Sequence, residues 1–430
     1  MSKKLTIAIA GLGTVAGGLV QALQENAQWI TQRLGREISI KYILVRNPDK
    51  YGSVKLPVET KLTTNPDTLI GDPEVDVFVE LIGGIEYPRT LITQALNNGK
   101  HVVTANKALL AETGTELFDL ANSKGLTLGY EASVCGAIPI IQVLRDSLAG
   151  NQLLSIAGIM NGTSNYILSE MSNNGLDFAS ALKQAQELGY AEADPTLDIE
   201  GFDTAHKLNL LIRLAWGVHY PYAKLPVAGV SKIESIDIHF AKELGYRIKL
   251  LGQARIQDGK LEAEVAPALV RNTMLIASVE GAFNAVHVQG NASGSLFFHG
   301  KGAGALPTAS AVLSDLVNIA RGTNASNMGF VEDNIQKAEI LPNEEAKGRH
   351  YFRFMVSDKP GVLRDVAAAM ADNNISVAQA IQKSATNDDS AVPLVFMTHE
   401  ATVGDVKRAL TQIKKAGILH SEPLHCRIIE

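Results

Sequence analysis

The feature that most constrains this chain is a glycine turn close to its N-terminus, directly after a short apolar segment. Residues 5–10 are predicted to form a buried strand, and Gly11-Leu-Gly13-Thr-Val-Ala16 follows it and begins a helix-compatible stretch over 15–32. The first glycine permits a tight turn, the second lets a pyrophosphate approach the backbone, and a small third residue lets helix and strand pack closely. The pattern indicates a dinucleotide-binding unit whose helix start faces the phosphates. A glycine-rich turn that binds no nucleotide is the alternative.

Further strands are expected at 38–45, 75–82, 101–104 and 126–130, with a helix over 89–98. Alternation of strands and helices in this order predicts a parallel, doubly wound sheet of the Rossmann type. We therefore predict a dinucleotide-binding domain over residues 1–139.

The remaining sequence changes character twice. Residues 140–340 combine strand-like and helical segments, which predicts an α+β domain for substrate binding and subunit contacts, and its helix over 306–320 is expected to pack back onto the first domain. The polar segment 341–349 contains Pro and Gly and is predicted to be a linker. Residues 350–430 then follow the order βαββαβ, which is the ferredoxin-like arrangement.

Composition excludes several classes of protein. The chain has 430 residues, too many for one core, and a formal net charge of −6 without long single-sign runs. Broad nucleic-acid or anionic-membrane binding needs concentrated positive charge, so neither is expected. No stretch approaches the ~20 apolar residues of a membrane span, and the N-terminal apolar run is too short for a signal peptide. Two cysteines exclude a disulfide framework, and we expect a cytoplasmic protein.

The end of the second predicted strand bears on the choice of nucleotide. NAD-binding chains usually place an acid there to hold the ribose hydroxyls, but this strand ends Leu44-Val45-Arg46-Asn47-Pro48. Arg46 could pair with the 2′-phosphate of NADP, or it could be a solvated loop charge. We favour NADP(H) and leave NAD(H) open.

Six segments together resemble the homoserine dehydrogenase family: GLGTVAGG at 11–18, VELIGG at 79–84, VVTANKALLA at 102–111, NGTSNYIL at 161–168, GYAEADPTLDIEGFDTAHKL at 189–208 and GAGALPTASAV at 302–312. The resemblance implies reversible, NAD(P)-dependent interconversion of L-aspartate 4-semialdehyde and L-homoserine, on the route to threonine, methionine and isoleucine. It adds Thr14, Val15 and Gly302 to the expected nucleotide contacts. Three positions depart from the family pattern, namely Ala16, Thr204 and Lys301.

Aldehyde reduction requires an acid that delivers a proton to the nascent alkoxide, and a lysine suits this role because its charge stabilises the oxyanion. Asp203 and Lys207 lie four apart and share one helix face. Spacing alone favours an exposed ion pair worth ~0.3–0.5 kcal/mol. The family resemblance instead implies substrate binding by Asp203 and proton donation by Lys207.

The resemblance also implies roles for residues outside that helix. Glu192 is expected to bind the α-ammonium group of the substrate, and Asp198 is a second candidate for this role. Lys107 follows a strand end where ligands of open α/β sheets collect. It could contact the nicotinamide, bind the substrate carboxylate or assist proton movement.

A loop over 131–138 (EASVCGAI) resembles a segment that holds a monovalent cation, Na⁺ or K⁺, in this family. Hard cations prefer oxygen ligands, and by position the carbonyls would belong to Glu131, Val134, Gly136 and Ile138. Cys135 within the loop invites an alternative thiol-nucleophile role, although a lone cysteine is more often a small apolar filler.

Residues 350–430 resemble an ACT domain, an amino-acid-binding module, through SDKPGVL at 357–363 and NNIS at 373–376. The resemblance and the pathway imply feedback inhibition by threonine, with Asp358, Gly361 and Asn374 as effector contacts, and a homodimer or homotetramer. The alternatives are a dimerisation domain without a ligand, a non-catalytic amino-acid sensor, and a thiol-dependent semialdehyde dehydrogenase on the same fold.

Overall fold

The computed structural model describes residues 4–52, 54–322, 327–330, 339–383 and 391–430. The chain divides into two compact units, each built from three segments. Unit 1 comprises Met1–Leu153, His206–Lys224 and Asn284–Lys337, and unit 2 comprises Leu154–Ala205, Leu225–Phe283 and Ala338–Glu430. Each unit therefore combines segments that are far apart in the sequence, and neither unit is one continuous stretch of the chain. No described helix is long and apolar enough to cross a membrane.

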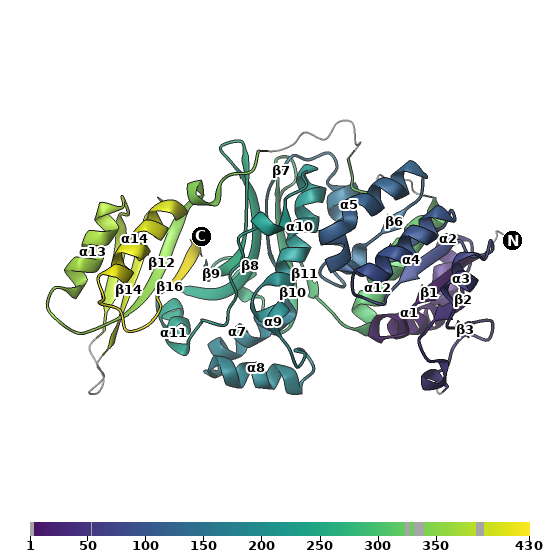
Figure 1. Cartoon of the computed structure of the whole chain (residues 1–430), viewed down its shortest axis with the longest axis horizontal. Coiled ribbons are helices and arrows are strands. Elements are labelled where there is room, and N and C mark those ends of the chain that lie inside the picture. Colours follow the sequence, from purple (N-terminus) through teal and green to yellow (C-terminus); the bar gives the residue numbers. More distant parts are fainter. Residues whose placement is uncertain (1–3, 53, 323–326, 331–338, 384–390) are drawn as a thin grey trace. The chain divides into compact units, whose positions relative to one another are not determined.

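Unit 1 contains a sheet of six parallel strands in the order β3-β2-β1-β4-β5-β6 (Figure 1). This order reverses direction between β1 and β4, as in doubly wound sheets, and the predicted Rossmann-type fold is confirmed. The strands are β1 (Leu5–Ala10), β2 (Ile38–Leu44), β3 (Lys61–Thr63), β4 (Val77–Glu80), β5 (His101–Thr104) and β6 (Leu128–Gly129).

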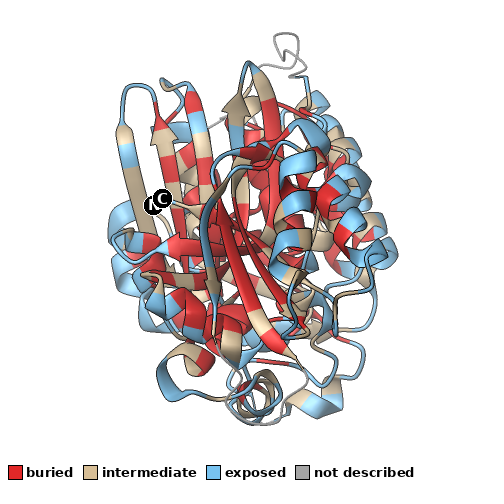
Figure 2. Cartoon of the chain, turned by 90° about the vertical axis from the view of Figure 1, so that its left-hand side faces the viewer, coloured by how far each residue is buried: buried red, intermediate tan, exposed pale blue. Residues whose placement is uncertain are grey.

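Helices of unit 1 cover this sheet and bury apolar side chains against it. The central strands β1, β4 and β5 are almost entirely buried, whereas β2 and the edge strand β3 are only partly buried. Figure 2 colours the whole chain by burial and shows the same contrast between buried strands and exposed outer helix faces. Helix α12 packs against α1 so closely that a Cβ on Gly18 would lie 2.4 Å from the Ala305 carbonyl oxygen. The helices are α1 (Thr14–Glu25), α2 (Ala27–Leu34), α3 (Pro66–Ile70), α4 (Glu86–Asn97), α5 (Lys107–Ser123), α6 (Ile140–Gln142) and α12 (Ala305–Arg321), and the strand pair is β10 (Phe283–Gly290) with β11 (Gly294–Lys301).

The helix-compatible stretch over residues 15–32 is helical, but it consists of two helices, α1 and α2, that meet at Asn26. Both the backbone N–H and the side-chain amide of Asn26 donate to the Ala22 carbonyl, at 3.0 and 3.2 Å. A side chain that competes for backbone groups in this way favours a helix end over its continuation.

Unit 2 is organised around strands in the order β7-β8-β9-β16-β12-β14-β13. Neighbours are antiparallel except β16 and β9, which pair in parallel through Arg427–Ala268 to Ile429–Val270. The elements are β7 (Leu153–Ile159), α7 (Gly162–Asn174), α8 (Phe178–Glu187), α9 (Thr196–Ile199), α11 (Ser235–Glu243), β8 (Tyr246–Gln257) and β9 (Lys260–Arg271). Helix α10 (Phe202–Trp216) begins in unit 2 and continues in unit 1.

The C-terminal module follows the predicted order βαββαβ, and its ferredoxin-like fold is confirmed. Its core is a cluster of aromatic and aliphatic side chains between the sheet and two helices. The strand β12 already begins at Lys347, within the polar segment. The elements are β12 (Lys347–Val356), α13 (Val362–Asp372), β13 (Val377–Gln382), β14 (Val392–Thr398), β15 (Ala401–Thr402), α14 (Val403–Lys415) and β16 (Leu424–Ile429).

A buried ion pair joins this module to α11 within unit 2. The guanidinium of Arg353 on β12 lies 2.6 Å from Asp237 Oδ1 and 3.0 Å from Glu234 Oε1. Burial raises the pKa of Asp237, and the hydrogen bonds from Arg353 act against this shift. Removing either partner would leave an uncompensated buried charge, which is strongly destabilising.

Candidate active site

The glycine turn after β1 has the geometry that the sequence predicts. Gly11 has φ +95, and a Cβ there would lie 2.8 Å from the Leu81 carbonyl oxygen. Only glycine combines this backbone conformation with such a close approach. Gly13, in contrast, has open space around the position of a Cβ. The turn is therefore tight on the side of β4 and open on the other side.

The start of α1 is the natural place for an anion. Gly13 is its N-cap, no side chain caps it, and its first turn carries no acid. Gly13 and Thr14 are exposed, while Val15 is half-buried and Ala16 is fully buried. Uncapped N–H groups and the positive end of the helix dipole favour a phosphate there. These residues fit the pyrophosphate of a nicotinamide dinucleotide.

Arg46 is exposed and follows β2 after one intervening residue. Because β2 and β1 are parallel neighbours, their carboxyl ends meet at the same edge of the sheet as the glycine turn. The segment from Val45 to Pro48 contains no acid at this edge. A guanidinium at this place suits an additional phosphate on the ribose.

Glu80, at the end of β4, belongs to the segment VELIGG and has no role predicted from the sequence. Its carboxylate is fully buried and accepts hydrogen bonds from Ile82 N at 2.7 Å, Gly83 N at 3.1 Å and Thr104 Oγ1 at 2.6 Å. It therefore braces the loop after β4 against the end of β5. The local pattern VELIGG does not reveal the hydrogen bond with Thr104, because Thr104 lies 24 residues further along the chain.

Lys107 is the first residue of α5, at the carboxyl end of β5. Asn106 precedes it as N-cap, accepts from Leu109 N at 3.2 Å and donates through Nδ2 to the Gly84 carbonyl at 2.6 Å. The cap thus ties the start of α5 to the glycine-rich loop after β4. Lys107 is half-buried and lies at the edge where the nucleotide is expected.

Helices α5 and α10 lie side by side within unit 1. Arg213 donates to Thr115 Oγ1 at 2.9 Å and stacks over the Phe118 ring, and His206 Nε2 lies 4.0 Å from Glu112 Oε1. Lys207 follows His206 and is 8% exposed. The two candidate lysines therefore belong to two helices that pack against one another.

Asp203 stands one turn before Lys207 on α10 and is 6% exposed. The interpretation of these two residues as an exposed surface pair is therefore wrong, because both are more than nine-tenths buried. Burying charged groups is costly unless they are paired or used.

Unit 2 brings Asp203 together with Asp198. Asn161, the N-cap of α7, donates through Nδ2 to Asp198 Oδ1 at 2.7 Å and to Asp203 Oδ2 at 2.8 Å. Two carboxylates that share one amide form an anionic cluster suited to an ammonium group. The sequence predicted both acids as substrate ligands but missed Asn161.

Glu192 is not brought into this cluster. It is exposed, and its carboxylate makes no hydrogen bond or ion pair with any other described residue. Its backbone carbonyl accepts from Gln186 Nε2 at 3.2 Å. An exposed carboxylate on this loop is available to a ligand, but the structure gives it no fixed partner within the described chain.

The loop over 131–138 is buried and sharply turned. Cys135 and Gly136 have φ of +54 and +51, and a Cβ on Gly136 would lie 2.5 Å from the Gly302 carbonyl oxygen. Gly302 is also closely packed, because a Cβ there would lie 2.2 Å from the Asn284 side chain, which would have to move. Gly302 thus contacts the loop as well as belonging to the predicted nucleotide segment. Cys135 is fully buried, which argues against a thiol nucleophile.

A pair of buried acids flanks this loop. The Glu131 carboxylate accepts from Ile141 N at 2.9 Å and Gln142 N at 2.8 Å, and Asp315 Oδ2 accepts from Glu131 N at 2.9 Å. Burial raises the pKa of Glu131 to about 8 and that of Asp315 to about 7. The charge of Asp315 also acts to raise the pKa of Glu131. At neutral pH this region therefore holds less negative charge than its two acids suggest.

The three predicted effector contacts do not all lie together. Asp358 accepts from Gln382 Nε2 at 3.3 Å, and Gly361, with φ +100, is the N-cap of α13. Asn374 follows the other end of α13, and 11 helical residues span ~17 Å. Within one chain, Asn374 is therefore separated from the other two.

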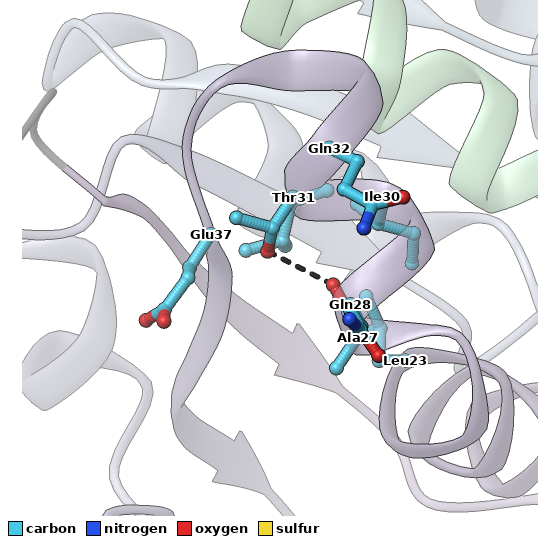
Figure 3. A pocket seen from close by; sticks show the side chains of 8 residues that line it. Leu23, Ala27, Gln28, Ile30, Thr31, Gln32 and Glu37 are labelled. Atoms are coloured by element: carbon cyan, nitrogen blue, oxygen red, sulfur yellow. Dashed lines mark hydrogen bonds between the residues drawn. The ribbon is translucent and has the colours of Figure 1, made fainter.

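A pocket of unit 1 lies away from these residues. It is formed by the end of α1, by α2 and by the beginning of β2, and Figure 3 shows Thr31 donating to the Ala27 carbonyl along its wall. It thus lies towards the amino edge of β2, away from the glycine turn. Its lining includes the acid Glu37 but neither candidate lysine.

Comparisons with known proteins agree on one family. The family models that match are "Homoserine dehydrogenase, NAD binding domain" over residues 11–131, "Homoserine dehydrogenase" over 139–317 and "ACT domain" over 350–417. A homoserine dehydrogenase of Neisseria gonorrhoeae is 43% identical over 418 residues, 96% of this chain and 95% of that protein.

Solved structures give the same result. A homoserine dehydrogenase from Thiobacillus denitrificans matches with a TM-score of 0.93 and 43% identity, over 100% of this chain and 99% of that one. A hyperthermophilic archaeal homoserine dehydrogenase in complex with NADPH matches with a TM-score of 0.61 and 26% identity, over 73% of this chain and 97% of that one.

Proposed function

The chain belongs to the homoserine dehydrogenase family, a family of NAD(P)-dependent oxidoreductases, and from this we propose that it reduces L-aspartate 4-semialdehyde to L-homoserine with NADPH. The observation that carries the proposal is the joint placement of buried Asp203 and Lys207 on α10. The reaction serves the synthesis of threonine, methionine and isoleucine. We place it in the cytoplasm, where unbridged cysteines are the norm.

We propose that Lys207 is the general acid. Bound NADPH would supply the hydride to the aldehyde carbon. The carbonyl oxygen gains negative charge as the hydride arrives, and Lys207 stabilises it and then donates a proton to give the hydroxyl group. In homoserine oxidation the neutral lysine accepts that proton. Asp203 and Asp198 hold the α-ammonium group, with Glu192 as a further acid on the loop.

The nucleotide would be held at the carboxyl edge of the unit 1 sheet. The start of α1, with Gly11, Gly13, Thr14 and Val15, supports binding of the pyrophosphate, and Arg46 supports preference for a 2′-phosphate. Lys107 is proposed to lie near the nicotinamide, and Gly302 is a further proposed contact. NADH use is the alternative, and kcat/KM for both nucleotides decides between them.

Two further features belong to this proposal. The carbonyls of Glu131, Val134, Gly136 and Ile138 would hold Na⁺ or K⁺, because carbonyl oxygens in a buried, sharply turned loop are the ligands that such cations prefer. The C-terminal module would bind threonine as an inhibitor and would pair in a homodimer or homotetramer. Light scattering tests the oligomeric state, and inhibition assays with threonine test the effector.

One assay tests the main proposal. NAD(P)H oxidation is followed with aspartate semialdehyde, and Lys207→Ala is expected to lower kcat by 10²–10⁴-fold, the range for a lost general acid. Lys207→Arg keeps the positive charge but donates a proton poorly, so it should also be slow. A folded wild-type protein without semialdehyde-dependent oxidation contradicts the reaction. Full turnover by Lys207→Ala contradicts only the role of that residue.

A further inference from the structure

The first turn of α7 is bonded through three different side chains to the acidic loop, which we define as residues 190–201 (YAEADPTLDIEG), and to Asp203 just after it. Besides the two hydrogen bonds from Asn161, Thr163 Oγ1 donates to the Tyr190 carbonyl at 2.7 Å, and Ser164 Oγ donates to the Asp198 carbonyl at 2.8 Å. These contacts bridge 27 and 34 residues of sequence. The segment NGTS therefore holds the loop at its beginning and its end.

The orientation of the Asn161 amide is fixed by its own helix. Oδ1 accepts from Ser164 N at 2.8 Å as the N-cap of α7, so Nδ2 must face away from the helix. An amide nitrogen has two protons, and Asp198 and Asp203 each provide an acceptor for one. Asn161 is 5% exposed, so water competes little for these donors.

We infer that Asn161 is a positioning residue for the reaction, which holds Asp198 and Asp203 at the separation that receives the substrate ammonium group. This inference rests on the proposed function. Asp198 and Asp203 repel one another when ionised, and a neutral donor between them offsets that repulsion without neutralising the charge that the substrate needs. Because Asp203 shares α10 with Lys207, its placement also bears on the acid.

The capping role and the positioning role of Asn161 can be separated by two substitutions. Asn, Asp and Ser are about equally good N-caps, so Asn161→Asp and Asn161→Ser both keep an acceptor for Ser164 N. Asn161→Asp replaces the shared donor by a third acid, and the shorter Asn161→Ser cannot reach both carboxylates. A residue that only caps α7 would tolerate both changes.

We expect kcat/KM for homoserine to fall ~100-fold in Asn161→Asp and ~10-fold in Asn161→Ser, since misplacement by ~1 Å costs on the order of 10²-fold. The loss should lie mainly in KM for homoserine, with KM for the nucleotide within about twofold. Asp177→Asn is the matched control, because Asp177 caps the neighbouring helix α8 through Ser180 N at 2.7 Å and touches neither acid. Values within twofold of wild type for both Asn161 variants would overturn the inference.

A second measurement keeps this test separate from the proposed function. In Asn161→Asp the three acids raise one another's pKa, so the melting temperature relative to wild type should fall more at pH 8 than at pH 5. An equal fall at both pH values would contradict the shared contact. A wild-type protein that does not oxidise homoserine would contradict the proposed function. The comparison of melting temperatures would still show whether Asn161 contacts both Asp198 and Asp203.

Discussion

Helix α1 of unit 1 begins at the glycine turn, and helix α7 of unit 2 begins beside Asp198 and Asp203, but the starts of these two helices are built in opposite ways. The start of α1 has a glycine cap, no side-chain bond and open space, so its N–H groups remain available for a ligand. The start of α7 is closed by Asn161, whose oxygen satisfies the helix and whose nitrogen binds two acids.

A helix N-terminus can therefore serve two purposes, to bind a ligand directly or to orient neighbouring side chains. An uncapped start offers positive potential to a ligand that arrives with its own charge. A capped start has lost that potential, but its side chain gains a fixed direction and can orient its neighbours. Three substitutions test this comparison at α1, α6 and α10.

Gly13→Asp should have the largest effect, because it converts the open start of α1 into a closed one. The backbone of Gly13 is extended and a Cβ meets nothing within 4 Å, so an aspartate fits without strain. We expect KM for NADPH to rise on the order of 100-fold, about 2.7 kcal/mol, while stability is unchanged or slightly higher.

Kinetics and thermal melting check this result together. Gly150→Asp, on an exposed turn with equal free space, is the control for added charge. Normal KM for NADPH in Gly13→Asp would mean that the open start of α1 is not the phosphate site.

Asp315→Asn tests a third kind of helix start, that of α6, where two N–H groups donate to the buried carboxylate of Glu131. The protonation of Glu131 and of its neighbour Asp315 changes with pH, so the stability of this start should also change with pH. Both acids have a raised pKa in the folded protein, so they favour folding below pH ~4, and this contribution is lost as pH rises through about 7 and 8. The amide of the variant cannot ionise. Urea unfolding should therefore show a gain on the order of 2 kcal/mol at pH 8.5 and almost none at pH 4.5. A pH-independent difference would contradict the raised pKa values.

Thr204→Val should have the smallest effect, because valine replaces the hydroxyl with a methyl group of nearly the same size. The Thr204 hydroxyl lies in the first turn of α10, is fully buried and has no hydrogen-bond partner among the described residues. Removing an unsatisfied buried hydroxyl in this way should stabilise the protein by ~1 kcal/mol and raise Tm by ~2–4 °C. Thr163→Val removes a bonded hydroxyl and should lower Tm. A lower Tm for Thr204→Val would indicate a partner for this hydroxyl.

The fold was largely predictable because its signals are local. Alternating strands and helices after a glycine turn imply the parallel, doubly wound sheet of unit 1, and the order βαββαβ implies the ferredoxin-like fold of the C-terminal module. The break at Asn26 was not predictable from apolar periodicity, because it depends on the conformation of one residue, whose side-chain amide donates back to the Ala22 carbonyl.

The candidate site was predictable residue by residue but not as an arrangement. Asp198, Asp203 and Lys207 were identified through the family resemblance, since their spacing alone favours a solvated pair. Asn161 and Glu80 were missed because their partners lie 24 to 42 residues away, and such contacts leave no periodic signal. Asn161 and Glu80 meet these partners only in the folded chain.

The parallel pairing of β16 with β9 has a practical consequence for experiments that remove or exchange the C-terminal module. The last strand of the chain adds to a sheet that starts more than 150 residues earlier, and Arg353 neutralises Asp237 on α11. A truncated enzyme would expose the edge of β9 to other molecules, which invites aggregation. Modules grafted from relatives would have to bring a matching terminal strand and a matching arginine, so this module cannot be exchanged as an independent part.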